Sequence, residues 1–192
     1  MVYDSYIKDY IDKERELLNL LDCTSISSLL LQILNAYEQE AAIYIFGNGG
    51  SAATASHFAN DFNKGISEYT DKKFRFCCLN DNIPTVMAIA NDIGYENVFE
   101  FQLAGKVKEN DLVIGISGSG NSDNVVRAVR LANQAGAMTA GICGFSGGAL
   151  ANEAKVVMHV PCNNMQLVED IHMILCHTMM SACYQMWNIK TH

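Results

Sequence analysis

The first forty residues carry apolar positions at a helical period. Charged residues separate the apolar ones over residues 4–21, and a second periodic set follows over residues 25–39, so two N-terminal helices are predicted. The apolar positions of the first helix are Ile7, Ile11, Leu17, Leu18 and Leu21, and those expected to face inward from the second are Leu29, Leu30, Ile33 and Leu34.

The pattern changes at residue 41. Short apolar runs, typical of buried parallel strands, occupy residues 41–46, 74–79, 112–116, 138–143 and 156–160. Helical segments are expected between and after them at residues 52–64, 84–90, 97–103, 122–134 and 165–187. This alternation predicts an α/β fold with a parallel sheet and right-handed crossovers.

No change of composition suggests a linker, so residues 1–192 are expected to form one domain. Its parts would be a helical pair over residues 1–40 and an α/β core over residues 41–192. The segment 165–187 is apolar nearly all round and contains five methionines, which indicates a helix that is buried or packs against a partner.

Composition narrows the class of protein. Hydrophobic residues make up 49% of the chain and charged residues 18%, below the usual share of about 25%, which excludes a disordered chain and suggests surface buried between subunits. The net charge is −8, and no basic cluster occurs beyond Lys72, Lys73 and Arg75, so nucleic acid is not an expected partner. The longest stretch free of charged residues, 131–152, contains five glycines and is no membrane span.

Cysteine usage indicates the compartment. The seven cysteines form no C-x-x-C pair and lie mostly in apolar runs, where a free thiol behaves as a small hydrophobe. The N-terminus is charged throughout and has no signal-peptide core. A cytoplasmic protein without a disulfide framework is therefore expected.

Two glycine-rich loops each follow a predicted strand and open a predicted helix. The first is GNGGSAA at residues 47–53, and the second is ISGSGNSDN at residues 116–124. Glycine lets the backbone approach a ligand, and a helix N-terminus presents free N–H groups to an anion. The first loop is neither a G-x-G-x-x-G nor a P-loop motif. Taken alone, it fits a plain strand-to-helix turn as well as an anion site.

The second loop shifts that balance towards a ligand. Ser117, Ser119 and Ser122 place three hydroxyls around two glycines. Ligands of parallel sheets bind at the carboxyl ends of the strands, so both loops can face one crevice and hold one phosphate without a cation. The competing interpretation is a serine-capped helix after a glycine turn.

Ionisable residues lie on two of the predicted helices. His57 and Asp61 are four residues apart and share one helix face, where they would form an acid/base pair, two metal ligands or an ordinary hydrogen bond. Glu169 and His177 interrupt the apolar C-terminal helix, about 12 Å of rise and roughly 80° of turn apart, so their side chains are just within reach of one another. We expect a function for this second pair.

Two further polar residues on the C-terminal helix have a simpler interpretation. Asp170 and His172 are expected to form a solvated edge, because burial of ionisable groups is unfavourable unless they are paired or used.

Four motifs in this order resemble the SIS family of sugar-phosphate isomerases and, more narrowly, the phosphoheptose isomerases that act on sedoheptulose 7-phosphate. They are GNGGSAA, NDIGYENVF, GISGSGNSDNV and the EDIH…H helix, and the resemblance covers about residues 1–187. It implies a three-layer sandwich with a five-stranded parallel sheet, flavodoxin-like but without a nucleotide, plus two N-terminal helices and a long C-terminal helix. It also implies a homotetramer with active sites between subunits.

The resemblance implies aldose–ketose isomerisation, most simply of sedoheptulose 7-phosphate to a heptose 7-phosphate. A base removes a proton next to the carbonyl, an enediol forms, and a second group moves protons between the oxygens. The acid/base groups would be Asp61, Glu169 and His177, and one zinc ion per site would be bound by His57, Asp61, Glu169 and His177. The sugar phosphate would be held by Asn48, Gly49, Ser51, Asp92, Ser117, Ser119 and Ser122.

Three positions depart from the family pattern. Asp61 stands where the family has Glu, Glu169 where it has Gln, and Gly118 where it usually has Thr. These changes leave open which carboxylate is the base and whether the sugar has seven carbons, and one hydroxyl around the phosphate is missing.

Two alternatives to this isomerase remain. One is a non-catalytic SIS protein that binds phosphosugars or regulates, of the type that associates with a replication initiator, but such members would be expected to lose the acid/base set. A SIS lyase or etherase is weaker, because such enzymes usually carry an extra domain.

Overall fold

The computed structural model describes residues 3–190 and contains a five-stranded, all-parallel sheet in the order β2-β1-β3-β4-β5. The strands are β1 (Ile43–Gly47), β2 (Phe76–Cys78), β3 (Leu112–Ser117), β4 (Met138–Cys143) and β5 (Val156–His159). Every residue of the central strand β3 is buried, as its unbroken apolar run requires. The predicted α/β class, strand number and parallel direction are confirmed.

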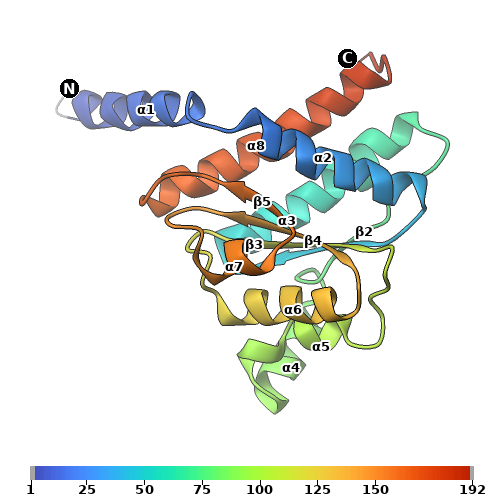
Figure 1. Cartoon of the computed structure of the whole chain (residues 1–192). Helices are drawn as coiled ribbons and strands as arrows, with labels where there is room; N and C mark the ends of the chain where they lie inside the picture. Colours follow the sequence, from blue (N-terminus) through green and yellow to red (C-terminus); the bar gives the residue numbers. More distant parts are fainter. Residues whose placement is uncertain (1–2, 191–192) are drawn as a thin grey trace.

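Helices cover both faces of the sheet, as Figure 1 shows. One face carries α2 (Cys23–Glu38), α3 (Gly50–Asn60) and α8 (Met165–Met186), and the other carries α4 (Ile83–Asp92), α5 (Glu100–Leu103) and α6 (Asp123–Gln134). A separate apolar core fills each interface, with Phe58 and Phe62 in the first and Phe46 and Phe99 in the second. The sheet thus forms the middle layer of a three-layer sandwich.

The second helix has the expected inward face. Leu29 and Ile33 are fully buried, and Leu30 and Leu34 pack against the same core. The helix begins where the Asp22 carboxylate accepts hydrogen bonds from the backbone N–H groups of Thr24 and Ser25, a typical N-cap. The N-cap therefore sets where α2 begins, and the packing of its apolar side confirms the predicted helix.

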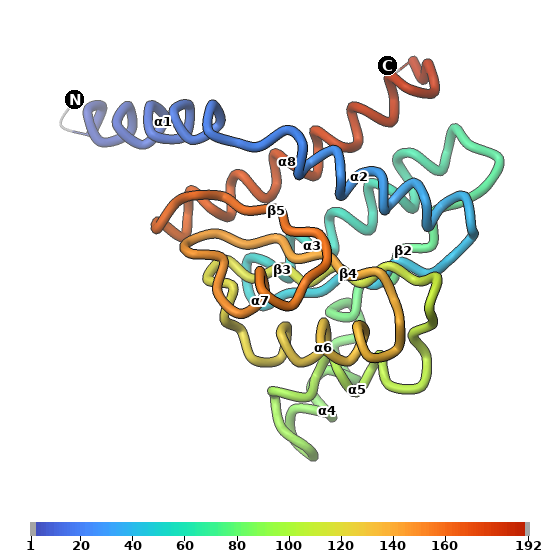
Figure 2. The backbone as a smooth tube through the Cα atoms, in the orientation of Figure 1, coloured from blue at the N-terminus to red at the C-terminus, as the bar shows by residue number. Residues whose placement is uncertain are grey.

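The first helix, α1 (Asp4–Leu18), ends before residue 21, where the predicted helix ended. It projects away from the body of the molecule in Figure 2, and Leu17 is its one buried residue among those described. Ile7 and Ile11, two of the apolar positions that define its period, are 58% and 50% exposed. The apolar side of α1 is therefore open in a single chain.

Four short elements were not predicted. The helix expected over residues 52–64 begins at Gly50 and gives way at Asp61 to a π-helical turn, η1 (Asp61–Ile66), which the 3-10 turn η2 (Ser67–Tyr69) follows. The glycine-rich stretch before β5 forms α7 (Gly148–Glu153), entered through two glycines with positive φ. The segment expected as one helix over residues 97–103 divides into a 3-10 turn, η3 (Tyr95–Asn97), and α5.

Among residues 3–190, no single helix is long and apolar enough to cross a membrane. Helices α1 and α2 pass that length and composition test only as a pair, bent by 73°.

Candidate active site

Helix α8 passes three parts of the molecule in turn. Its first residue, Met165, lies over Gly118 in the loop between β3 and α6. One turn later the Glu169 carboxylate lies against Gly50, where α3 begins. Two turns further on, His177 meets residues at the end of α3. The sequence motifs on these segments are thus aligned along a single helix.

His57, Asp61 and His177 form the densest cluster of ionisable groups along α8. Their ligating atoms all lie within 4.8 Å of one another. The two Nε2 atoms are 2.9 Å apart, and Asp61 Oδ2 lies 3.3 Å from that of His57 and 3.6 Å from that of His177. The i, i+4 spacing places His57, in the last turn of α3, and Asp61, which follows that helix, on the same side, as expected, and α8 supplies the third residue. The three donors are arranged as a metal ion would require.

The cluster has an exposed and a buried side. The imidazoles are 42% and 56% exposed, whereas the Asp61 side chain is only 12% exposed. On the buried side, the Cys176 thiol donates a hydrogen bond to Asp61 Oδ2 at 3.8 Å. Burial, and then the negative charge of Asp61, raise the pKa of this thiol well above its usual value. Cys176 therefore remains a protonated donor.

Glu169 takes a separate place beside this cluster. An added Cβ on Gly50 would lie 2.6 Å from both carboxylate oxygens, so the Glu169 carboxylate packs directly against this glycine. The free N–H groups and the dipole at a helix N-terminus favour a negative charge at this point. Glu169 is therefore poised over the start of α3, and the structure does not include it in the His57–Asp61–His177 group.

The serine-rich loop lies at the carboxyl end of β3. Ser117 Oγ is 3.0 Å from Ser122 Oγ, and Ser119 Oγ accepts a hydrogen bond from the backbone N–H of Asn121. Ser122 is the N-cap of α6, and no helix N–H occupies its side chain within the described chain. Two hydroxyls are thus gathered at a helix N-terminus, as an anion site needs.

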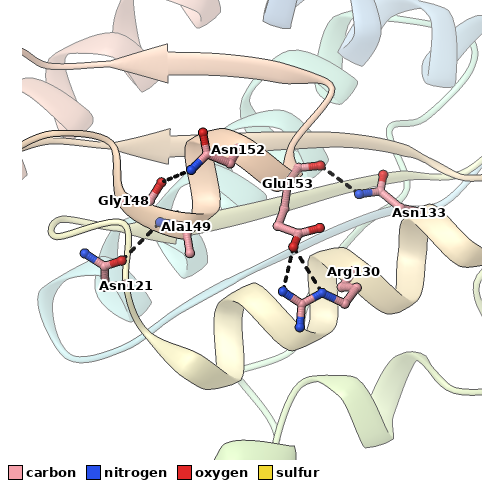
Figure 3. Close-up of polar contacts among 7 residues, drawn as sticks. All are labelled: Asn121, Arg130, Asn133, Gly148, Ala149, Asn152 and Glu153. Carbon is pink, nitrogen blue, oxygen red and sulfur yellow. Dashed lines mark hydrogen bonds and ion pairs between the residues drawn. The ribbon is translucent and has the colours of Figure 1, made fainter.

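Neighbouring segments hold the serine-rich loop firmly. Asn121 Oδ1 accepts a hydrogen bond from the backbone N–H of Ala149 on α7 (Figure 3). The carbonyl of Gly120 accepts one from the backbone N–H of Leu150 on the same helix. Arg130 on α6 forms an ion pair with Glu153 at the other end of α7. The unpredicted helix α7 is therefore the support of the serine-rich loop.

The first glycine-rich loop is ordered by an amide pair. Asn48 and Asn124 exchange two side-chain hydrogen bonds of 2.9 and 3.0 Å, and the Tyr95 hydroxyl donates to Asn48 Oδ1 at 2.8 Å. Gly49 is exposed with φ of +54°, and Ser51 is buried against Gly47. Asn48 thus faces α6, while the Glu169 carboxylate lies against the N-terminus of α3.

The remaining candidates fall outside these clusters. Asp92 is exposed at the end of α4, on the opposite face of the sheet from α3 and α8, and accepts a hydrogen bond from Asn91 (Figure 1). Asp170 is exposed, as expected, and accepts a hydrogen bond from the Tyr10 hydroxyl, which raises the pKa of Tyr10 to about 12. Within one chain, Asp92 does not join the group that α8 organises.

The expectation for His172 was wrong. Its side chain is not on a solvated edge but only 2% exposed, on the buried side of α8. Neither ring nitrogen has a well-aligned hydrogen-bond partner within residues 3–190. Burial lowers its pKa to about 4, which the nearby carbonyl of Cys143 offsets only in part. A neutral imidazole tolerates the apolar interior because it carries no charge to desolvate.

Two residues of the site were missed at the sequence level. Cys176 lies in an apolar run, where a thiol is usually a small core residue. Tyr95 belongs to the NDIGYE motif, but no spacing rule connects its hydroxyl to Asn48. The position of Cys176 next to His177 was the one available signal.

Comparison with known proteins places the chain in a family. A family model described as a SIS domain matches residues 9–144. The phosphoheptose isomerase of Aneurinibacillus thermoaerophilus is 31% identical over 172 residues, which cover 89% of this chain and 83% of the relative.

Two solved structures extend the agreement to three dimensions. Phosphoheptose isomerase GmhA from Neisseria gonorrhoeae superimposes with a TM-score of 0.84 at 28% identity, over 94% of this chain and 96% of that one. A phosphoheptose isomerase from Francisella tularensis gives 0.86 at 25% identity, over 95% and 96%. The chain therefore belongs to the phosphoheptose isomerase family of SIS-domain proteins.

Proposed function

We propose that this protein interconverts sedoheptulose 7-phosphate and a heptose 7-phosphate by proton transfer through an enediol. The observation that carries the proposal is the convergence of His57, Asp61 and His177 on the helix that also passes Glu169 and the serine-rich loop. A phosphosugar-binding protein without catalysis has no need of three converging ionisable groups. The relatives named above support the same conclusion, because they are called phosphoheptose isomerases.

The order of residues along α8 supports a placement of the substrate. The phosphate would bind at the N-terminus of α6, to Ser117, Ser119 and Ser122, where the carboxylate of the first turn, Asp123, is paired with Arg127. The carbonyl end then extends along α8 towards Glu169 and the His57–Asp61–His177 group. Asn48 and Gly49 line the start of this path, and Ser51 orders the backbone below it.

Glu169 or Asp61 removes the proton next to the carbonyl, and His177 moves protons between the two oxygens. Glu169 has the better position as base, because it lies between the serine-rich loop and the histidines along α8. Asp61 has its oxygen shared between two imidazoles, which makes it the better ligand. General acid/base groups of this kind contribute about 10²–10⁴-fold each.

The donor set fits a zinc ion. Two ligands about 2.0–2.1 Å from a tetrahedral zinc are about 3.3–3.4 Å apart. The separations of 2.9, 3.3 and 3.6 Å among His57, Asp61 and His177 bracket that value. These three residues would hold the ion, and Glu169 is proposed as the fourth ligand or the base. When bound, zinc supplies a Lewis acid that polarises the substrate carbonyl.

The protein is also proposed to be a homotetramer that completes its sites between subunits. The apolar side of α1 is open in a single chain, and the imidazoles of the site are about half exposed. Asp92 cannot reach the His57–Asp61–His177 group of its own chain, because the sheet lies between α4 and α8. A second copy could supply both the cover and this carboxylate.

Proton exchange in D₂O tests the activity directly. The protein, zinc-loaded or treated with chelator, is incubated with five-, six- and seven-carbon ketose phosphates, and exchange of the C1 proton is followed by NMR. We expect exchange on sedoheptulose 7-phosphate, and a loss of at least about 100-fold in Glu169→Gln and His177→Ala. Gln185→Ala, an exposed change further along α8, serves as the matched control.

Two other outcomes would change the proposal. Exchange only on a shorter sugar would support the isomerase reaction but assign it to a different substrate. Absence of exchange on every sugar, with phosphosugar binding intact, contradicts the isomerase and favours a binding protein.

A further inference from the structure

We infer that Cys176 is a positioning residue for Asp61. Its thiol donates a hydrogen bond to the carboxylate from the protein interior and so fixes the direction in which Asp61 faces His57 and His177. This inference deepens the proposed function, and it rests on that function only where turnover is measured.

Three groups converge on one oxygen atom. Asp61 Oδ2 lies 3.8 Å from Cys176 Sγ, 3.3 Å from His57 Nε2 and 3.6 Å from His177 Nε2. The two imidazoles reach it from the exposed side, whereas the thiol is fully buried. Torsion about the last bond of an aspartate is soft, so a carboxylate held from one side only can rotate. The Cys176 thiol holds the Asp61 carboxylate from the interior, opposite the two imidazoles.

The chemistry of the contact gives it a direction. An ionised carboxylate accepts hydrogen bonds only, and a protonated thiol is a weak donor, so the S–H group points at the oxygen. A charged acceptor strengthens such a bond about twofold. Within residues 3–190, no other interior group donates to the Asp61 side chain. Cys176 is therefore the one described donor that can hold this carboxylate from within.

The position of Cys176 in α8 links this contact to the rest of the site. It precedes His177 directly, so the two side chains leave the helix about 100° apart and reach Asp61 from different sides. The helix that carries one imidazole therefore also orients the carboxylate that faces it. Residues that orient the ligands of a metal typically change affinity or activity by about 10–100-fold when replaced.

Two substitutions of Cys176 distinguish the loss of its hydrogen-bond donor from a change in core packing. Cys176→Val removes the S–H group and keeps a buried apolar side chain, while Cys176→Ser restores a hydroxyl donor. The matched controls are Cys183→Val and Cys183→Ser, seven residues further along the same helix. Cys183 is as fully buried as Cys176, but burial is the one cause that raises the pKa of its thiol, to about 11. It therefore reports on packing alone.

Three measurements follow. Zinc affinity is determined by competition with a chelator. The values of kcat and KM are measured with the ketose phosphate that the wild type turns over. The S–H stretching band of each cysteine is isolated in an infrared difference spectrum between wild type and the corresponding serine variant. We expect Cys176→Val to lower zinc affinity and kcat by about 10-fold or more, with KM little changed. Cys176→Ser should recover most of both, and both Cys183 variants should stay within about twofold of wild type.

The infrared band tests the contact without any activity. The Cys176 band should lie at lower frequency than the Cys183 band and move towards it in an Asp61→Asn background. A Cys176 band that coincides with that of Cys183, or an equal loss in Cys176→Val and Cys183→Val, overturns the inference. A wild type that isomerises no sugar refutes the proposed function instead, and zinc affinity and the S–H band then still decide the role of Cys176.

Discussion

At the scale of single residues, the most unusual environment in the molecule belongs to His172. Its imidazole is buried, and its pKa in the native state is about 4, compared with 6.5 for an ordinary histidine. Between these values the unfolded chain binds a proton that the native chain does not. The free energy of unfolding therefore falls as the pH drops from 6.5 to 4, by up to roughly 3 kcal/mol, while above pH 6.5 the histidine has no such effect.

Replacing His172 should flatten this pH dependence. We expect His172→Leu to lose less stability between pH 7 and pH 5 than the wild type, because its unfolded state gains no proton at this position. Urea unfolding of chelator-treated protein at several pH values measures the effect, free of protonation at metal ligands. His159→Gln is the control, since His159 is only partly buried and bonds to the Phe145 carbonyl. Equal slopes in wild type and His172→Leu would contradict the assignment.

The sequence predicted individual residues where local geometry decides their neighbours. The i, i+4 spacing was enough to place His57 beside Asp61, because the chain continues helically from α3 into the turn η1. The position of Glu169 over Gly50 depends on how α8 packs on α3, which no local rule supplies. His172 was misjudged for the same reason, since the side of an apolar helix that is buried is set by its neighbours.

At the scale of elements, the turn that follows α3 is the distinctive feature. Asp61 is the first residue of the π-helical turn η1, and Asn63 in that turn bonds to both backbone groups of Phe76, at 2.9 Å each. Such turns are rare and occur frequently at functional sites. Asn63 therefore fastens the turn that begins with Asp61 to the strand β2.

Breaking this attachment should destabilise the protein. We expect Asn63→Ala to lower the free energy of unfolding by about 1–3 kcal/mol, because two backbone groups of Phe76 lose their partner. Chemical denaturation measures the change, and Asn60→Ala, an exposed substitution just before the turn, is the control. An unchanged midpoint in Asn63→Ala would show that water replaces the amide without loss.

Elements with strong periodicity were the predictable ones. All five strands were found from their apolar runs, because buried parallel strands need uninterrupted apolar residues. The turn η1 and the helix α7 were not, since a π-helical turn has no period of its own over six residues and glycine is a poor helix former. Of the short elements that were not predicted, these two support Asp61 and the serine-rich loop.

At the scale of the whole molecule, α1 stands apart from the compact sandwich (Figure 2). The large exposed apolar side chains of this helix and of its N-cap are Tyr3, Tyr6, Ile7, Ile11 and Leu18. A continuous row of this kind on a soluble surface marks an interaction site. The helical period was correctly identified in the sequence, but periodicity cannot tell whether the face packs on its own chain or on a copy.

Negative charge introduced on the apolar side of α1 should dissociate the proposed tetramer. We expect wild type to sediment as a tetramer and the double variant Ile7→Asp, Ile11→Asp to sediment as a smaller species, because burying carboxylates at an apolar contact is unfavourable. Lys8→Asp changes the charge on the exposed side of α1 without removing an apolar contact and should leave the tetramer intact. A wild type that is monomeric at micromolar concentration would refute both the tetramer and the shared site.

The attachment of the serine-rich loop to α7 bears on the thermodynamics of ligand capture. Gly120 and Asn121 are held by hydrogen bonds to Leu150 and Ala149 within the protein itself. A loop that its own chain orders has little conformational entropy left to lose on binding a ligand. The hydroxyls of Ser117 and Ser122, held against one another, would only need to turn outward. For the phosphate site proposed above, this attachment implies preorganised recognition, and adaptation to sugars of different length would fall to the opposite end of α8.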